Sequence, residues 1–364
     1  MTIHFSTHTK FIRNFAIALL GISSSLLPAQ AGDTYKWTVQ YVIDNSQVVY
    51  GQPQKVWPRR NRGLAISPDG KFLYAGYHHS LNGQGEVRKL AVGITDDFAR
   101  ATIRVLPGPL GKAIATDDKG RVYIANQSSV LVYDENLSQL QFSFQTSLSE
   151  GIAVVREGNE LALYNSERQI GVVRRWVLEE KNGLIIGAVP AANYGEDGAF
   201  LLQAARGLRG VEVDSKGRAW VADSEGGRVF RVSKDGKSAE SVDLESAMDI
   251  GFDGDRAYVT RGTDRVISVL EIESMKVLGH LAIPWEELEV SPLGNNRLGA
   301  LSGIAMVPGK GFFVSNENGQ TADFKSTYGK ADAHTDLING KLYRDAIIDD
   351  NDPILQALIV PDAK

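Results

Sequence analysis

The alternation of apolar and polar residues between residues 208 and 236 predicts short paired strands. Residues 211–214 and 218–222 are rich in β-branched and aromatic side chains, which favour a pleated, half-buried strand. Gly217 ends the four-residue turn segment 214–217, and glycine can adopt the positive φ that a tight hairpin turn requires. A third run, 228–232, leads into a second turn at residues 234–236. The segment therefore predicts consecutive antiparallel strands.

The same pattern recurs along the chain, which predicts a repeat architecture. Copies begin at residues 63, 113, 151, 210, 249 and 303. Most intervals are close to the ~40 to 50 residues of a four-stranded propeller blade. No helical period extends beyond one turn, so we expect an almost all-β chain with six blades.

Three segments carry a resemblance to known propellers. Residues 210–224, GVEVDSKGRAWVADS, resemble NHL repeats, while residues 62–74, RGLAISPDGKFLY, and 149–153, SEGIA, are similar to the gluconolactonase/regucalcin group. The resemblance covers most of the chain after residue 60. It implies an all-β, six-bladed β-propeller of four-stranded blades, and it implies no particular activity, because this fold hosts many functions.

The two ends of the repeat region predict how the ring closes. Residues 35–43 alternate as a strand before the first repeat, and the last repeat lacks strands of its own. Its candidates after residue 315 are 341–348 and 354–360. We expect the N-terminal strand to join the blade that contains Gly303, because closure removes exposed strand edges.

The first 31 residues have the order of a secretory signal peptide. His4, His8, Lys10 and Arg13 precede an apolar run over residues 15–27, and the A-x-A segment Ala29-Gln30-Ala31 follows. The apolar run is shorter than the ~20 residues of a membrane span, and no comparable run follows it. We expect export to the periplasm or the extracellular space, one propeller domain over residues 32–364, and no membrane span in the mature chain.

Composition excludes two function classes. The chain has 39 Lys and Arg against 44 Asp and Glu, for a net charge of −5. This balance gives no basic field for a nucleic-acid backbone, so we expect no nucleic-acid partner. The absence of cysteine excludes disulfides, a thiol nucleophile and thiolate metal ligands.

Long connections predict a working face. The insertions at residues 77–85, 191–207, 284–300 and 316–340 all join strands on one side of the expected ring, whereas most turns on the other side are compact. Long loops in compact domains are usually functional or disordered. We expect a small-molecule ligand or a protein partner on this face.

Polar residues that begin the inner strands should meet at the mouth of the central channel. Aligned on the turn glycines, these entry residues are Arg62, Lys112, Glu150, Arg209, Met248 or Asp249, and Ser302. The residues that end the second strands should join them: Tyr77 with His78, Asn126, Asn165, Asp223, Arg261 and Asn316. Two readings stay open, a hydrogen-bonded plug of paired charges or a ligand site.

The resemblance to the gluconolactonase/regucalcin group implies a metal held by a Glu, an Asn and an Asp at inner-strand entries. Glu150 matches the first of these, but Arg62 and Arg209 occupy the other two positions. Like charges 4 Å apart cost about 4 kcal/mol at an effective dielectric constant of ~20, so we do not favour Ca²⁺ there. A displaced oxygen-rich site built from Asn126, Asn165, Asp223 and Asn316 remains an alternative.

Three functional hypotheses follow. The first is a small anionic ligand held by Arg62, Lys112, Arg209 and Arg261, because guanidinium groups grip carboxylate and phosphate groups. The second is a gluconolactonase-like hydrolase or lyase that transfers protons through Glu150 or His78. The third is a protein-interaction scaffold.

Overall fold

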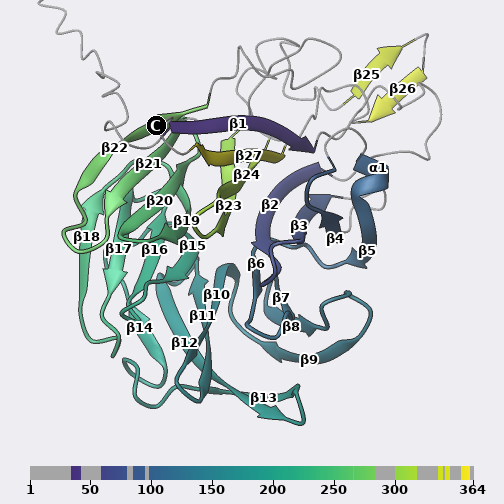
Figure 1. The fold of residues 1–364 in the computed structure, drawn as a ribbon. Helices are drawn as coiled ribbons and strands as arrows, with labels where there is room; N and C mark the ends of the chain where they lie inside the picture. Colours follow the sequence, from purple (N-terminus) through teal and green to yellow (C-terminus); the bar gives the residue numbers. More distant parts are fainter. Residues whose placement is uncertain are drawn as a thin grey trace, which may run out of the picture.

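The protein forms a closed ring of β-sheets in a computed structural model (Figure 1). The structure describes residues 34–41, 59–79, 85–94, 98–264, 266–283, 300–317, 335–338, 341–344 and 354–360. Six sheets surround a central axis, and the strand that begins each repeat lies innermost. The six-bladed β-propeller implied by the resemblance to NHL and gluconolactonase/regucalcin proteins is confirmed.

Each of the first three blades is an antiparallel meander that leads from the channel outward. Blade 1 contains β2 (Arg59–Ile66), β3 (Phe72–His79), β4 (Gly85–Ala91) and β5 (Thr102–Gly108). Blade 2 contains β6 (Ile114–Thr116), β7 (Val122–Asn126), β8 (Ser129–Tyr133) and β9 (Leu140–Gln145). Blade 3 contains β10 (Ser149–Glu157), β11 (Glu160–Glu167), β12 (Val172–Lys181) and β13 (Leu184–Pro190), with β14 (Ala199–Leu201) added beside β12.

The remaining blades follow the same order. Blade 4 contains β15 (Leu208–Val213), β16 (Ala219–Asp223), β17 (Arg228–Val232) and β18 (Ala239–Asp243). Blade 5 contains β19 (Ala247–Asp253), β20 (Arg256–Arg261), β21 (Val266–Glu271) and β22 (Val277–Ala282). Blade 6 contains β23 (Ala300–Val307), β24 (Gly311–Glu317), β27 (Ile354–Val360) and β1 (Thr34–Tyr41).

The predicted ring closure is confirmed. β1 pairs antiparallel with β27, which pairs with β24, so the N-terminal strand is the outermost strand of the blade that contains Gly303. The hydroxyl groups of Tyr35 on β1 and Tyr258 on blade 5 lie 2.7 Å apart. Tyr35 and Trp37 also pack on Phe312, which anchors the closing strand in the core between blades 5 and 6.

Three local expectations need correction. β26 (Lys341–Arg344) pairs with β25 (Thr335–Ile338) in a separate hairpin instead of completing blade 6, because β1 and β27 already supply its two outer strands. The connection over residues 191–207 contains β14, which pairs with β12. The polar strand β18 was not expected from the sequence, because its residues AESVD lack the apolar content of a half-buried strand.

Apolar cores lie between neighbouring blades. Trp220 of blade 4, for example, is fully buried and packs edge-on against Phe252 of blade 5 at 5.6 Å. One short helix, α1 (Phe98–Ala101), precedes β5. No helix in the described part of the chain has the length and apolarity needed to cross a membrane.

Candidate functional site

A repeated β-bulge turns the entry residues toward the channel. The pairing of the first two strands shifts register at the start of the inner strand in blades 1, 3, 4, 5 and 6. The shifted segments include Arg62, Glu150, Arg209, Met248 and Ser302. A bulge leaves a residue out of the ladder and redirects its side chain. The entry residues thus leave the sheet pattern at the channel mouth.

Glycines beside these bulges allow neighbouring inner strands to come close together. A Cβ atom at Gly151 would collide with the carbonyl oxygen of Arg209, and one at Gly303 would collide with that of Arg62. A Cβ atom at Gly210 would collide with the carboxylate of Asp249. The glycines at these positions therefore hold the entry residues of adjacent blades side by side.

Hydroxyl groups on second strands fix the backbone of the next blade's entry residue. Thr260 donates to the carbonyl oxygen of Ser302 at 2.6 Å, and Ser315 donates to that of Arg62 at 3.4 Å. Ser166 makes the same contact with the carbonyl oxygen of Arg209. One such hydrogen bond therefore lies at each of three junctions, between blades 3 and 4, blades 5 and 6, and blades 6 and 1.

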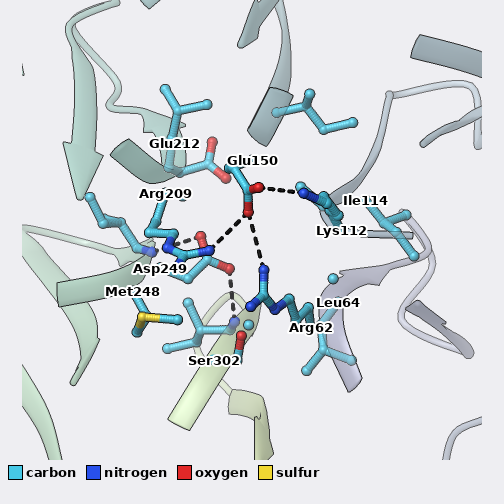
Figure 2. A pocket seen from close by; sticks show the side chains of 18 residues that line it. Arg62, Leu64, Lys112, Ile114, Glu150, Arg209, Glu212, Met248, Asp249 and Ser302 are labelled. Atoms are coloured by element: carbon cyan, nitrogen blue, oxygen red, sulfur yellow. Dashed lines mark hydrogen bonds and ion pairs between the residues drawn. The ribbon is translucent and has the colours of Figure 1, made fainter. Parts of the chain in front are cut away.

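The entry residues surround a cavity of about 50 Å³ at the channel mouth (Figure 2). Every blade contributes to its lining, which includes Arg62, Lys112, Glu150, Arg209, Met248, Asp249 and Ser302. The structure therefore brings together all the residues that the sequence placed at inner-strand entries. The cavity lining also includes Glu212, which lies three residues after Arg209 in β15 of blade 4. The sequence pattern does not predict this residue.

Glu150 is the centre of what we call the mouth cluster, composed of Glu150, Arg62, Lys112 and Arg209. Nη1 of Arg62 lies 3.1 Å from Oε2 of Glu150, and Nη1 of Arg209 lies 2.9 Å from the same oxygen. The ammonium group of Lys112 contacts Oε1. The Glu150 side chain is 1% exposed, whereas the three cations are 13% to 18% exposed and so face the cavity.

The cations determine the charge state of Glu150. Burial alone would raise its pKa, but the hydrogen bond from Lys112 and the charges of Lys112, Arg209 and Arg62 outweigh burial and hold the pKa below its usual range. Glu150 is therefore a stable carboxylate near neutral pH. A lowered pKa makes Glu150 a weak proton donor near neutral pH, and its expected catalytic role remains a prediction.

Two other carboxyl groups in the cavity have the opposite shift. Burial raises the pKa of Asp249 to about 7, although the amides of Ile304 and Ile250 donate to its oxygens, both at 3.0 Å. Burial also raises the pKa of Glu212 to about 7, against the hydrogen bond from the amide of Val213 and with repulsion from Asp249. Both groups can gain or lose a proton near neutral pH.

Most second-strand residues serve the scaffold and do not line the cavity. Asp223 accepts hydrogen bonds from the amides of Arg206, Gly207 and Gly226. Asn126 accepts one from the amide of Leu110. Arg261 donates to the carbonyl oxygen of Glu245 and pairs with Asp264. These bonds hold the loops at the channel mouth, and the ligand contacts expected for these residues remain predictions.

Asn165 does not end the second strand of blade 3 as the sequence predicts, because β11 continues for two residues beyond it. Glu167 pairs with Ser149 in the register, which is the position that Asp223 and Arg261 hold in their blades. Asn165 instead accepts a hydrogen bond from the Trp176 indole at 2.8 Å. The side chains of His78 and Asn316 lie outside the described residues, so their expected roles remain predictions.

The mouth cluster offers a poor environment for a divalent cation. Three positive groups already occupy both oxygens of Glu150, and a metal ion there would be repelled by them. Within the described ranges, no group of three or more His, Asp or Glu side chains is placed to hold a metal. Of the alternative oxygen ligands, Asn126, Asn165 and Asp223 already accept the bonds given above. The expectation of no Ca²⁺ at Glu150 remains a prediction.

Comparison with known proteins supports the fold and nothing finer. No family model and no curated protein matches the chain. The WD40 repeats of RRP9 superpose with a TM-score of 0.51 and 10% identity, over 92% of this chain and 99% of that one. U3-55K gives 0.50 and 11%, over 84% and 97%. A calcium-binding regucalcin from Agrobacterium tumefaciens gives 0.49 and 12%, over 83% and 92%. At these identities the likeness shows a β-propeller fold alone.

Proposed function

We propose that the protein binds a small anion at the channel mouth. The observation that carries the proposal is the mouth cluster itself, in which cations from blades 1, 2 and 4 share a single carboxylate from blade 3. Guanidinium and ammonium groups form charge-assisted hydrogen bonds with carboxylate and phosphate oxygens.

Glu150 has the role of a scaffold in this proposal. Its two oxygens hold three cations in fixed positions, although each cation repels the other two. Because Glu150 is buried and the cations are partly exposed, an incoming anion meets the cations first. The ligand then accepts hydrogen bonds from the sides of these cations that face the cavity.

The double change Arg62→Ala with Arg209→Ala tests this proposal. Isothermal titration with inorganic and organic anions should show binding to the unchanged protein. Charge-assisted hydrogen bonds contribute roughly 1.5 to 3 kcal/mol each, so the double variant should bind about two to four orders of magnitude more weakly. Arg261→Ala is the matched control, because Arg261 is on the same face but bonds to Glu245 and Asp264.

If the mouth cluster is only a hydrogen-bonded plug of paired charges, the same variant should give a different result. Removing two partners of Glu150 would lower the melting temperature, and no anion would bind to either protein. Binding that persists unchanged in the double variant, or a stability loss without any ligand for the unchanged protein, contradicts the anion site.

A hydrolase is the second candidate, favoured by the pair of carboxyl groups with pKa near 7 in the same cavity. Proton transfer would then use Asp249 and Glu212 in place of Glu150. A screen of lactones and esters tests it: hydrolysis should fall at least a hundredfold in Asp249→Asn. Activity that survives in this variant removes Asp249 from the reaction.

We also propose that the protein is exported, on the strength of the signal-like order of residues 1–31. Sequencing the N-terminus of the protein recovered from cells should give Gly32 as the first residue. A protein that retains its first residues in the cytoplasm contradicts export.

A further inference from the structure

The cavity contains acceptors as well as cations. Asp249 from blade 5 and Glu212 from blade 4 line the same space as Arg62, Lys112 and Arg209 (Figure 2). The charged groups of the lining are therefore three cations and three carboxyl groups, and blade 6 contributes Ser302. A site that only attracts anions needs the three cations and no carboxyl groups other than Glu150. The carboxyl groups of Asp249 and Glu212 therefore indicate that the ligand also offers them a hydrogen-bond donor.

Glu150 differs from these two groups because its oxygens are already held by cations. The oxygens of Asp249 each accept one backbone amide, from Ile250 and from Ile304. Glu212 accepts the amide of Val213 at 2.9 Å through Oε1. A carboxylate oxygen has two lone pairs, so each of these oxygens keeps acceptor capacity after its amide bond. The amide bonds also fix the direction in which that capacity points.

An ionised carboxylate accepts hydrogen bonds and cannot donate them. An anion without a proton meets repulsion at Asp249 and Glu212, whereas an anion that carries an O–H group can donate to them. The cavity of about 50 Å³ limits the ligand to a few heavy atoms, because one water molecule needs roughly 10 to 15 Å³ by the same measure.

We propose that the cavity selects a small oxyanion that keeps a proton, with hydrogen phosphate as the prototype, and rejects a fully ionised oxyanion of the same size. The anion oxygens contact Arg62, Lys112 and Arg209, and its O–H group donates to Asp249 or Glu212. This inference rests on the proposed anion site. It adds the class of anion.

Free phosphate and a phosphate ester differ in whether they keep a proton that can be donated to Asp249 or Glu212. At pH 8 hydrogen phosphate keeps its last proton, whereas a phosphate monoester, with a second pKa of about 6, has none. Sulfate has the size and shape of phosphate and also lacks a proton. Methyl phosphate and sulfate are therefore matched probes that remove the donor and keep the charge.

The experiment is isothermal titration of the full chain at pH 8 with inorganic phosphate, sulfate and methyl phosphate. Phosphate should bind at least about a hundredfold more tightly than either of the other anions, because a site built to accept a hydrogen bond rejects an analogue without the donor. Equal affinity for phosphate and sulfate overturns the inference and leaves the anion site in place. No binding of any of the three anions overturns the anion site itself.

Asp249→Asn and Glu212→Gln sharpen the test, because the amide keeps the shape of the side chain and adds a donor. In each variant sulfate should bind at least about tenfold more tightly than it does to the unchanged protein, and phosphate should lose its advantage. Glu240→Gln is the control, since Glu240 lies on the exposed outer strand of the same blade. A variant that unfolds is replaced by the other, and unchanged selectivity in a folded variant contradicts the inference.

Discussion

Two charged clusters lie at opposite ends of the inner strands, and their surroundings differ. The turn network joins three cations to three carboxylates around the β6–β7 turn and the ends of β10 and β12: Lys119, Arg121, Arg156, Asp117, Asp118 and Glu180. The mouth cluster gathers Arg62, Lys112 and Arg209 around Glu150, beside a cavity that Asp249 and Glu212 also line, and Arg168 lies 4.0 Å from Glu150. The turn network pairs its charges with one another and stabilises the fold, whereas the mouth cluster presents partly exposed cations to a cavity in which an ion can bind.

The turn network also has a second copy, which marks it as part of the scaffold. Asp117 accepts Nε of Arg121 at 2.5 Å and the hydroxyl of Tyr123 at 2.9 Å. In blade 4 Asp214 accepts Nε of Arg218 at 2.7 Å and the indole of Trp220 at 3.0 Å. No second copy of the mouth cluster occurs among the described blades, because its four residues come from four different blades and meet at one point.

The largest expected effect is on the turn network. Asp117→Ala leaves buried Arg121 without its nearest carboxylate, which should lower the free energy of unfolding by about 3 to 5 kcal/mol. Chemical denaturation measures this loss, and anion affinity should stay unchanged. Asp118→Ala is the control, because half-exposed Asp118 should cost less than about 1 kcal/mol. A loss of anion binding in Asp117→Ala would show that the two clusters are not independent.

Glu150→Gln should separate the clusters by its response to ligand. Losing the carboxylate leaves the mouth cations repelling one another, so the free energy of unfolding should fall by about 2 kcal/mol. Phosphate should restore it, because a bound ligand stabilises the folded state by mass action. Affinity for phosphate should rise about tenfold. Glu225→Gln, at an exposed carboxylate nearby, is the control. A destabilised variant that phosphate does not rescue contradicts the scaffold role of Glu150.

The carboxyl groups of the cavity should change the free energy of unfolding with pH in opposite directions. Asp249 and Glu212 have pKa values raised to about 7, so the folded state holds protons that the unfolded chain has lost, and stability falls as pH rises from about 4.5 to 7. Glu150 has a lowered pKa, so its contribution is present above about 4.5 and is lost at lower pH.

Denaturation curves at several pH values measure this effect. Each proton contributes a slope of at most about 1.4 kcal/mol per pH unit. Asp249→Asn should flatten the slope between pH 5 and 7, and Glu240→Gln should not change it. An unchanged slope in Asp249→Asn would show that Asp249 does not hold a proton in this range.

The sequence predicted the ring of entry residues because the turn glycines give each blade a common origin. Arg62, Lys112, Glu150 and Arg209 can thus be aligned from the sequence alone. Glu212 could not, because the bulge between Leu208 and Val211 shifts the strand, and a bulge has no reliable signature in one sequence. A signal existed, however, since Glu212 is a charged residue between two valines of an inner strand.

Chemical roles were harder to predict than positions. Glu150 was expected to transfer protons, but the number of cations that reach it depends on side-chain directions in four blades. Asn165 was misplaced because strand length varies between blades, and β11 extends to Glu167. The length of a strand and the number of cations around a carboxylate are both determined where distant segments meet, which periodicity along the chain does not report.

Closure of the ring by β1 also sets the order of assembly during synthesis. Tyr41 ends a strand whose partner begins at Ile354, so β1 leaves the ribosome long before the segment with which it pairs. Until β27 is made, β1 and β24 both present open edges, at which a strand from another chain can add. The nascent protein therefore has its greatest exposure to mispairing just before translation of blade 6 is complete.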